Sequence, residues 1–257
     1  MSDENTAFYD GLAEEYHLVY YDWAASVDRQ GEALDRVIRG KLGVGWKRIL
    51  DCSCGIGTQS LGLARRGHGV LGVDLSPRAV ERARAEAKFA GLEIEFRVGD
   101  LRQLEVVTAD VFDVVLSCDN SLPHLLTDTD LRQGIRSMLE RVRPGGLFLA
   151  SIRDYDQILQ ERPVTTQPAP SGAPGSRRIT FQVWDWQTDG RSYRLELFVL
   201  AEDGENSWRV RSHRGSYRAV TRSELSAILE EGGASRVEWR MPQDSGFFQP
   251  LVVAQRP

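Results

Sequence analysis

The residues best suited to bind a ligand form a short acidic, glycine-rich run followed by two later carboxylates. The run is Asp51-Cys52-Ser53-Cys54-Gly55-Ile56-Gly57, and Asp74 and Asp100 each end a later apolar stretch. Glycines let a backbone approach a ligand closely, and an acidic residue about 20 positions later can accept hydrogen bonds from ribose hydroxyls. A glycine pair alone also fits a tight structural turn. The three features together predict a nucleoside site, with Asp100 at the adenine edge.

Two cofactor classes use this layout, namely nicotinamide dinucleotides and S-adenosylmethionine. The dinucleotide fingerprint is Gly-x-Gly-x-x-Gly, with a glycine that opens the turn. Here Ser53 stands in the place of the first glycine, and Ser60 is not a glycine either. An acidic Asp51 before the loop suits a cationic, amine-bearing ligand better than a pyrophosphate. The charge argument therefore favours S-adenosylmethionine.

A second set of polar residues follows the fourth and fifth expected strands. Asn120 and His124 lie in Ser117–Leu125, and Arg153 and Tyr155 lie in Ser151–Asp156. In a doubly wound sheet the carboxyl ends of neighbouring strands face one crevice, so we expect these side chains to converge.

Each of these residues also has a purely structural interpretation. His124 could be a loop histidine bonded to the backbone, and Asn120 could cap a turn. Arg153 could pair with Asp154 or Asp156 as an ordinary surface ion pair.

The elements that must position these residues alternate between strand and helix in the first half of the chain. The expected strands are 48–52, 69–74, 94–98, 111–117 and 147–152, and the expected helices are 59–66, 77–90 and 131–141. Ser76-Pro77 and Gly91 bound the second helix, and Pro144-Gly145-Gly146 ends the third. This alternation predicts a Rossmann-like, doubly wound, mostly parallel sheet with helices on both faces.

The pattern breaks at Pro163, where a loop rich in proline and glycine runs to Gly175. After it, β-forming runs at 179–186, 193–200 and 208–217 predict an antiparallel meander. A capping box, Thr221 to Glu224, opens a helix to Glu231, and strands at 237–241 and 250–254 close the chain.

We therefore expect a single domain over residues 1–257 with three parts. Residues 1–42, which are amphipathic and rich in aromatics, form an N-terminal helical cover. Residues 43–158 and 219–257 form the Rossmann-like core, and residues 159–218 form an antiparallel β insertion on the substrate side.

Bulk composition narrows the class of protein. The net charge is −5, so nucleic acid is not an expected partner, and no apolar run approaches the roughly 20 residues that span a bilayer. The polar, acidic start of the chain is unlike a signal peptide, so we expect a cytoplasmic protein. Cys52, Cys54 and Cys118 are too few for a disulfide framework or a metal site, and we expect small buried residues.

Several segments resemble class I methyltransferases, and more specifically glycine and glycine sarcosine N-methyltransferases. These segments include Tyr16–Trp23, Asp28-Arg29-Gln30, Cys118–Leu125, Arg153–Asp156, Tyr217-Arg218 and Ser245–Pro250. Ser53 departs from the family, which most often has glycine there. The resemblance implies a seven-stranded sheet whose last strand is antiparallel, and S-adenosylmethionine as cofactor.

The resemblance also implies roles for single residues. Arg153 would clamp the acceptor's carboxylate, Asn120, His124 and Tyr217 would line the acceptor pocket, and Trp23 and Arg29 would help to enclose the cofactor. We take Asn120, His124 and Tyr217 as candidate catalytic residues and Arg153, Tyr155 and Tyr20 as candidate substrate-binding residues. The candidate cofactor-binding residues are Tyr16, Trp23, Arg29, Asp51, Cys52, Ser53, Gly55, Asp74, Leu75, Asp100, Leu101 and Cys118.

The expected function is methyl transfer to the amine of a small amino acid of the glycine or sarcosine type, and a homo-oligomer is possible. Positioning and desolvation would carry most of this reaction, because a free α-amine has a pKa near 8 and needs no strong base. Two alternatives stay open from the sequence. One is O- or C-methylation of another small carboxylic acid or secondary metabolite, and the other is a non-catalytic cofactor-binding module.

Overall fold

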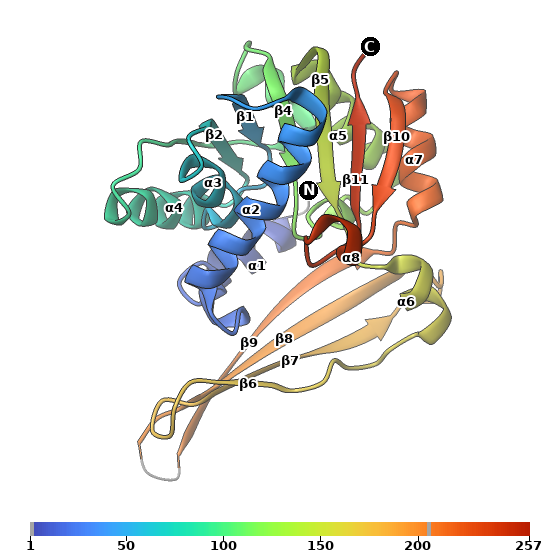
Figure 1. Ribbon diagram of the computed structural model, residues 1–257. Helices are drawn as coiled ribbons and strands as arrows, with labels where there is room; N and C mark the ends of the chain where they lie inside the picture. The colour runs from blue at the N-terminus through green and yellow to red at the C-terminus, as the bar shows by residue number, and fades with distance from the viewer. Residues whose placement is uncertain (1–2, 205–206) are drawn as a thin grey trace.

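The computed structural model describes residues 3–204 and 207–257, which form a seven-stranded sheet between helices and a second, smaller sheet beneath it (Figure 1). The strands of the large sheet lie in the order β10-β11-β5-β4-β1-β2-β3. Their bounds are β1 Arg48–Asp51, β2 Gly69–Asp74, β3 Glu95–Val98, β4 Phe112–Ser117, β5 Val142–Ser151, β10 Ser235–Arg240 and β11 Leu251–Gln255. Strand β11 runs opposite to the other strands of this sheet, which are parallel to one another, and this confirms the expected fold class.

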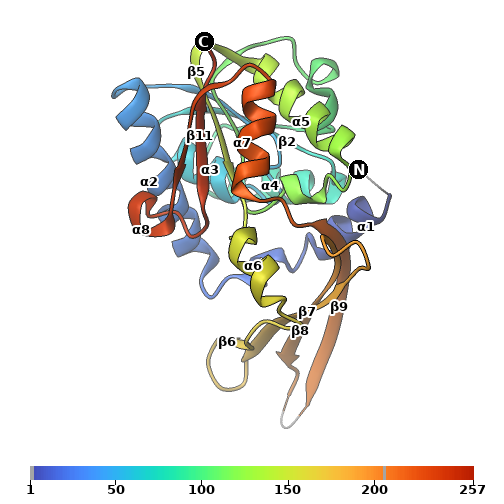
Figure 2. The same cartoon turned by 90° about the vertical axis from the view of Figure 1, so that its right-hand side faces the viewer.

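Helices cover both faces of this sheet because successive strand residues point to opposite faces. On one face, Ile49 packs with Leu34 and Ile38 of α2. On the other face, Leu50 packs in the cluster that includes Ile135 of α5, the face on which Figure 2 also shows α7. The helices of the core are α2 Trp23–Leu42, α3 Thr58–Ala64, α4 Pro77–Phe89, α5 Asp128–Arg141, α7 Arg222–Glu231 and α8 Pro242–Ser245, with 3-10 turns η2 Leu101–Val106 and η3 Leu122–His124.

The second sheet is antiparallel and lies beneath the carboxyl ends of the parallel strands (Figures 1 and 2). It contains β6 Ala169–Ser171, β7 Arg178–Trp186, β8 Ser192–Glu202 and β9 Trp208–Arg218. Its inner residues, such as Trp184, Tyr193 and Leu195, join the same hydrophobic cluster as the core strands. The meander expected from the β-forming runs is therefore present and is packed onto the large sheet.

The N-terminal segment connects the two sheets. It consists of α1 Asp3–Leu12, the 3-10 turn η1 Tyr16–Val19 and then α2. Helix α1 packs on β9, where a Cβ on Gly215 would touch the ring of Phe8. Helix α2 is fixed to α3 by backbone contact, because a Cβ on Gly31 would lie 2.5 Å from the carbonyl carbon of Gly62.

Several elements differ from the sequence prediction, among them β5, α6 and β6. Strand β5 begins at Val142 and runs through Pro144-Gly145-Gly146, because Gly145 and Gly146 bond with the backbone of Arg256 and extend the sheet. Helix α6, Tyr155–Glu161, was not predicted and begins where the Asp154 side chain accepts a hydrogen bond from the amide of Gln157. The proline-rich loop contributes the short edge strand β6, which pairs with β7.

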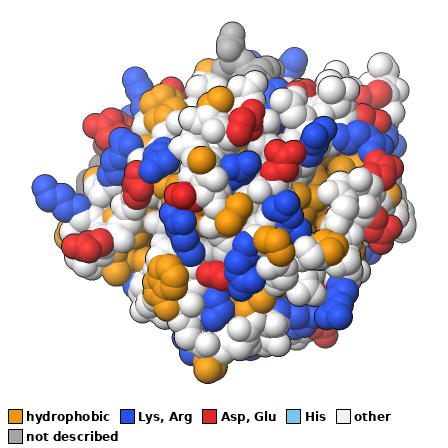
Figure 3. Space-filling model, turned by 90° about the horizontal axis from the view of Figure 1, so that it is seen from above, with side chains coloured by type: hydrophobic (Ala, Val, Ile, Leu, Met, Phe, Trp, Pro, Cys, Tyr) orange, Lys and Arg blue, Asp and Glu red, His pale blue; other side chains and the backbone are white. Residues whose placement is uncertain are grey.

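The outer surface carries mixed charge. On the face seen from above, acidic and basic side chains alternate with scattered apolar ones (Figure 3). Among the residues that the structure describes, no helix has both the length and the apolar composition needed to cross a membrane.

Candidate functional site

Asp51, the acidic residue that opens the glycine-rich loop, lies at the end of β1, and one of its two carboxylate oxygens makes no hydrogen bond within the described chain. Asp51 Oδ2 accepts a hydrogen bond of 2.7 Å from the hydroxyl of Ser60 in α3. Asp51 Oδ1 is buried and has no hydrogen-bond partner among the described residues. Burial raises the pKa of this carboxyl to about 7. The loop therefore holds a buried acceptor that lacks a donor.

The second carboxylate of the motif is tied directly to the loop. The amide of Gly55 donates to Asp74 Oδ2 at 2.8 Å, and the amide of Ser76 donates to Oδ1 at 2.9 Å. Burial raises the pKa of Asp74. Gly55 has a φ of 52°, and a Cβ there would meet nothing within 4 Å. The loop thus presents bare backbone beside a carboxylate, as a bound nucleoside requires.

The expected adenine-edge residue is engaged by its own neighbour. The carboxylate of Asp100 pairs with the guanidinium of Arg102 at 2.6 Å and also accepts the amide of Arg102. Leu101 is buried in the core cluster, and Leu75 is half-buried directly after Asp74. Arg102, which holds Asp100, lies two residues after it and outside the predicted cofactor motif.

The cysteines of the site are packing residues. Cys52, Cys54 and Cys118 are buried free thiols, as expected, and burial raises the pKa of each. Ser53 joins the loop to β4 through a 2.8 Å hydrogen bond between its hydroxyl and that of Ser117. Within residues 3–204 and 207–257, no three His, Cys, Asp or Glu side chains are grouped so as to hold a metal ion.

Helix α2 carries two of the expected cofactor residues, of which Trp23 reaches the end of the loop and Arg29 lies away from it. The indole nitrogen of Trp23 donates to the Thr58 hydroxyl at 2.9 Å, which joins the start of α2 to the start of α3. Arg29, one turn and a half later, is exposed and donates to the hydroxyl of Ser26 at 2.8 Å. Arg29 and Ser26 line the rim of a cavity.

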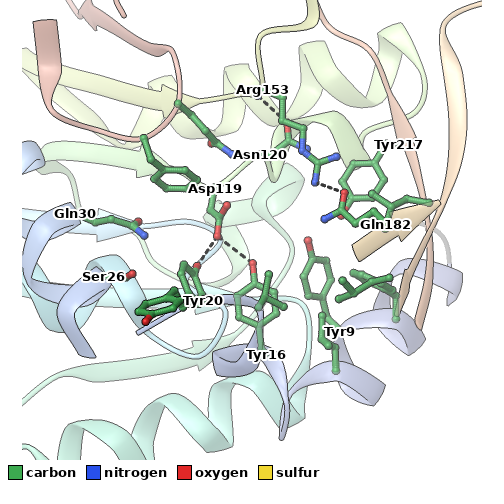
Figure 4. A pocket seen from close by; sticks show the side chains of 18 of the residues that line it. Tyr9, Tyr16, Tyr20, Ser26, Gln30, Asp119, Asn120, Arg153, Gln182 and Tyr217 are labelled. Atoms are coloured by element: carbon green, nitrogen blue, oxygen red, sulfur yellow. Dashed lines mark hydrogen bonds between the residues drawn. The ribbon is translucent and has the colours of Figure 1, made fainter. Parts of the chain in front are cut away.

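This cavity, of about 470 Å³, lies between the N-terminal segment, the carboxyl ends of β4 and β5, and the inner face of the second sheet (Figure 4). The polar part of its lining includes Asp119, Asn120 and Arg153. The apolar part includes Phe8, Leu12, Leu195 and Leu197. Tyr16 and Tyr20 also line the smaller space beside Gly55 and Asp74, so the two spaces adjoin.

Arg153 faces this cavity without an acidic partner. Its guanidinium donates to Gln182 Oε1 at 3.1 Å and to the Tyr193 hydroxyl at 3.3 Å, and it lies over the ring of Trp184 at 4.8 Å. No carboxylate of the described chain lies within ion-pair distance of it.

The structural alternative for Arg153, an ion pair with its neighbours, is wrong. Asp154 and Asp156 instead pair with Arg222 of α7, at 2.8 Å and 3.3 Å. Helix α6 turns these two carboxylates toward α7, which sequence proximity to Arg153 could not reveal.

Two consecutive residues after β4 adopt left-handed backbone conformations. Asp119 has a φ of 59° and Asn120 a φ of 66°. Asn120 Oδ1 accepts the amide of Arg153 at 3.0 Å, so it joins the ends of β4 and β5. Asp119 Oδ2 accepts the hydroxyls of Tyr20 at 2.6 Å and Tyr16 at 3.1 Å. Such strained pairs persist where the surroundings enforce them, and they concentrate at functional sites.

His124 is held on both ring nitrogens. Nδ1 lies 3.0 Å from the carbonyl of Ser216, so it carries the proton, and Nε2 then accepts the hydroxyl of Tyr9 at 2.7 Å. Burial lowers the pKa of His124 to about 3, and the ring is neutral. The histidine lies behind Tyr9 and Tyr217. This agrees with the alternative of a loop histidine bonded to the backbone. Its contacts position the phenol rings of Tyr9 and Tyr217.

Of the remaining residues predicted for the acceptor site, Tyr217 lines the cavity and Tyr155 lies behind its wall. Tyr217 lines the cavity and stacks on Tyr193, with ring centroids 5.4 Å apart. Tyr155 is fully buried, does not line the cavity, and bonds through its hydroxyl to that of Tyr193 at 2.8 Å. Tyr155 therefore supports the wall from behind.

Among the cavity residues that were not predicted as site residues, Tyr9, Asp119 and Gln182 make polar contacts with the predicted ones. Tyr9 belongs to the aromatic cluster of the first 42 residues, and Asp119 precedes Asn120 directly, so both had a signal that was left unused. Gln182 lies inside a β-forming run, and no local pattern marks it as a cavity residue.

Comparison with known proteins supplies the family. Residues 49–146 match the family of methyltransferase domains. The chain is 39% identical over 213 residues to the ubiquinone biosynthesis O-methyltransferase of Methylocella silvestris, which spans 81% of this chain and 71% of that protein. It is 32% identical over 126 residues to the glycine N-methyltransferase of Mus musculus, across 45% of this chain and 43% of that relative.

Among solved structures, the sugar N-methyltransferase KedS8 from Streptoalloteichus sp. ATCC 53650 has the same fold. The TM-score is 0.75, with 20% identity, over 95% of this chain and 94% of that one.

Proposed function

Because the chain belongs to the class I S-adenosylmethionine-dependent methyltransferases, we propose that it methylates the amine of a small acceptor that carries a carboxylate. Membership of this family makes the chain an enzyme, so the non-catalytic module is not retained. The observation that carries the acceptor class is Arg153, a guanidinium on the cavity wall without an acidic partner in the described chain.

The residues of the loop suit the cofactor. The free Oδ1 of Asp51 can accept an ammonium group, and Asp74 can accept ribose hydroxyls beside the bare backbone of Gly55. S-adenosylmethionine, when bound, supplies a methyl group on a sulfonium, which is an electrophile. The residues of the chain orient an acceptor toward that methyl group and exclude water.

Arg153 is built to receive a carboxylate. A cation withdrawn from water without a counterion is unfavourable, and a ligand carboxylate would supply that counterion. Gln182 and Tyr193 hold the two terminal nitrogens in position, which leaves the planar fork oriented for a bidentate pair. Stacking on Trp184 restricts the guanidinium further.

The cavity offers contacts to the rest of the acceptor. Asn120 and Tyr217 lie beside Arg153 on the cavity wall, so they would orient the amine once the carboxylate is held. His124 would act indirectly, through Tyr9 and Tyr217. Orientation of this kind can contribute roughly 7–11 kcal/mol at best, which is enough for an amine whose neutral form is already accessible.

A second candidate is O-methylation of an aromatic carboxylic acid. Phe8, Leu12, Leu195 and Leu197 form an apolar side of the cavity that a glycine-sized acceptor would leave largely uncontacted. The relative in Methylocella silvestris is named for O-methylation in ubiquinone biosynthesis.

A methyl-transfer screen with radiolabelled S-adenosylmethionine separates the two candidates. The acceptors are glycine, sarcosine, larger apolar amino acids, aromatic hydroxy acids and the carboxamide of each. We expect amines with a carboxylate to be methylated, and their carboxamides to have kcat/KM at least about 30-fold lower, because an unpaired buried charge costs roughly 2–5 kcal/mol. Turnover of hydroxy acids alone, or of carboxamides equally well, would overturn the proposal.

A further inference from the structure

Two side chains of opposite charge line the same cavity, and neither has a partner of opposite charge in the described chain. One is Arg153. The other is Asp119, whose Oδ2 accepts two phenol hydroxyls and whose Oδ1 has no hydrogen-bond partner among the described residues. In Figure 4, Asp119 lies between the two phenols and the Arg153 side of the cavity. A zwitterion is the ligand that neutralises both at once.

We propose that Asp119 binds the acceptor's ammonium group and removes its proton, which makes it a catalytic residue of this enzyme. The inference rests on the proposed function, since it requires an acceptor amine. It assigns the substrate class as a zwitterionic amino acid, with the carboxylate on Arg153 and the ammonium on Asp119.

The backbone places Asp119 for this role. Asp119 and Asn120 both have positive φ, and the Asp119 amide donates to the Ser151 hydroxyl at 2.8 Å. Tyr16 and Tyr20 engage Oδ2 alone, so Oδ1 is left for a donor from a ligand. A carboxylate with this geometry can form a charge-assisted hydrogen bond to an ammonium.

The proton transfer balances without any further reactant. One N–H proton moves to Asp119 Oδ1, the electron pair of that bond stays on nitrogen, and Asp119 becomes a neutral carboxylic acid. The nitrogen lone pair forms the new N–C bond while the methyl–sulfur bond breaks, and its electrons stay on sulfur. The proton on Asp119 passes to water after the products leave.

The pH profile can report on Asp119 because the other titratable groups that face it keep their charge in the tested range. They are Tyr9 from α1, Tyr16 from η1, Tyr20, Cys118 after β4, Tyr217 from β9, Arg153 after β5 and Arg29 from α2. Burial raises the pKa of each of these tyrosines and of Cys118, so they stay protonated near neutral pH, and arginine stays charged. Asp74, which lines the space beside Asp119 and whose pKa is raised by burial, and Asp51, whose pKa is about 7, are common to wild type and variant and cancel in their ratio.

The test is the pH profile of kcat/KM for Asp119→Asn against wild type, at saturating S-adenosylmethionine and with the best amino acid from the screen. Wild type can use the ammonium form, so its profile should be flat from neutral pH up to the pKa of the acceptor amine. The variant needs the free amine, so its kcat/KM should rise by about tenfold per pH unit and approach wild type near that pKa. A constant ratio across the range would overturn the inference.

Cofactor affinity distinguishes the rival role of Asp119, since it also borders the space beside Gly55. We expect Asp119→Asn to bind S-adenosylmethionine as wild type does, by calorimetry. A variant that loses the cofactor would show that Asp119 serves the cofactor instead. Asp110→Asn is the matched control, because Asp110 pairs with Arg48 on the surface before β4 and should leave the profile unchanged.

A second variant keeps the carboxylate and guards against misfolding. Tyr20→Phe removes the 2.6 Å donor to Asp119 but leaves its carboxylate in place, so kcat/KM should fall by the same factor at every pH up to the pKa of the acceptor amine. A profile that rises with pH as steeply as that of Asp119→Asn would show that disturbed packing causes the slope, and would overturn the role of Asp119. If wild type methylates no amine, the proposed function fails; if it does but Asp119→Asn keeps the wild-type profile, only this inference fails.

Discussion

The two walls of the ligand site are built in different ways. On the parallel sheet, Gly55 bonds to Asp74 only 19 positions away, and both belong to one strand-turn-helix-strand unit. At the wall formed with the antiparallel sheet, Arg153 reaches Gln182 and Tyr193 of that sheet across 29 and 40 positions, and Tyr9 of α1 bonds His124 across 115. The first wall follows from local rules, whereas the second exists only after the whole chain has folded. A motif can therefore reveal the cofactor, while the acceptor depends on contacts that a motif does not contain.

The largest expected effect tests the second wall, which carries Arg153 and depends on contacts between distant parts of the chain. Arg153→Lys keeps the charge but loses the planar fork, so kcat/KM for the carboxylate acceptor should fall by about 30-fold or more. The affinity for S-adenosylmethionine should stay near that of wild type. Arg222→Lys is the control, since Arg222 braces Asp154 and Asp156 and should lower stability without a comparable loss of kcat/KM. Equal losses in both variants would mean that Arg153 is also a brace.

The next effect concerns the histidine behind that wall. His124 has a folded pKa of about 3, below its unfolded value near 6.5, so its stabilisation is present above pH 6.5 and is lost as pH falls toward 3. Wild type should lose roughly 2–3 kcal/mol more than His124→Gln across that window. Urea unfolding at pH 7, 5 and 4 measures the difference. Parallel curves for the two proteins would show that the ring is not buried as a neutral group.

The first wall, which contains Gly55 and Asp74, is tested by Asp74→Ala. The variant removes a charged acceptor for ribose hydroxyls and leaves the Gly55 amide without its partner, so S-adenosylmethionine should bind more than tenfold more weakly. Calorimetry gives the affinity directly. Unchanged affinity, or tight binding of a nicotinamide dinucleotide in its place, would contradict the assignment of this loop.

A smaller effect of opposite sign is expected at Asp51. Its folded pKa of about 7 exceeds the unfolded value, so stability is lost as pH rises from about 4 through 7. Without cofactor, Asp51→Asn should be more stable than wild type at pH 8 by about 1 kcal/mol, and this gain should vanish at pH 4. The same variant should bind S-adenosylmethionine more weakly. A variant less stable than wild type at pH 8 would show that the carboxylate is satisfied.

The smallest effect lies where the two walls meet. The N-terminal segment forms part of the cavity wall, so amides in residues 8–30 should exchange hydrogen more slowly when the cofactor is bound. Hydrogen exchange with and without S-adenosylmethionine tests this. No change there would argue against a covering role for the segment.

What the sequence could predict follows the same division. The order of alternating strands and helices was predictable because hydrophobic periodicity and caps such as Ser76 and Thr221 act within one element. The loop from Asp51 to Gly57 was predictable because its chemistry is contiguous. Even here, Asp100 is held by Arg102, two residues later, which the motif does not include.

The acceptor wall was only partly predictable. Arg153, Asn120 and Tyr217 do line one cavity, but Tyr155 is turned into the core by helix α6, which no periodicity signalled. His124 is closed off by Tyr9 and Ser216, partners that come from opposite ends of the chain. Gln182 contacts Arg153 only because of its position in β7, and the β-forming pattern of that strand does not reveal this contact. These outcomes depend on tertiary packing that overrides local preference.

The contact between Gly31 and Gly62 limits which parts of the N-terminal segment can shift. Because backbone packs directly on backbone there, α2 and α3 form one rigid unit, and Trp23 is hydrogen-bonded to Thr58 across it. Any shift of α1 relative to this unit would have to be taken up between Leu12 and Trp23, which join the two. That stretch contains Tyr16 and Tyr20, whose hydroxyls hold Asp119. Such a shift would therefore also change the hydrogen bonds that hold the carboxylate on the cavity wall.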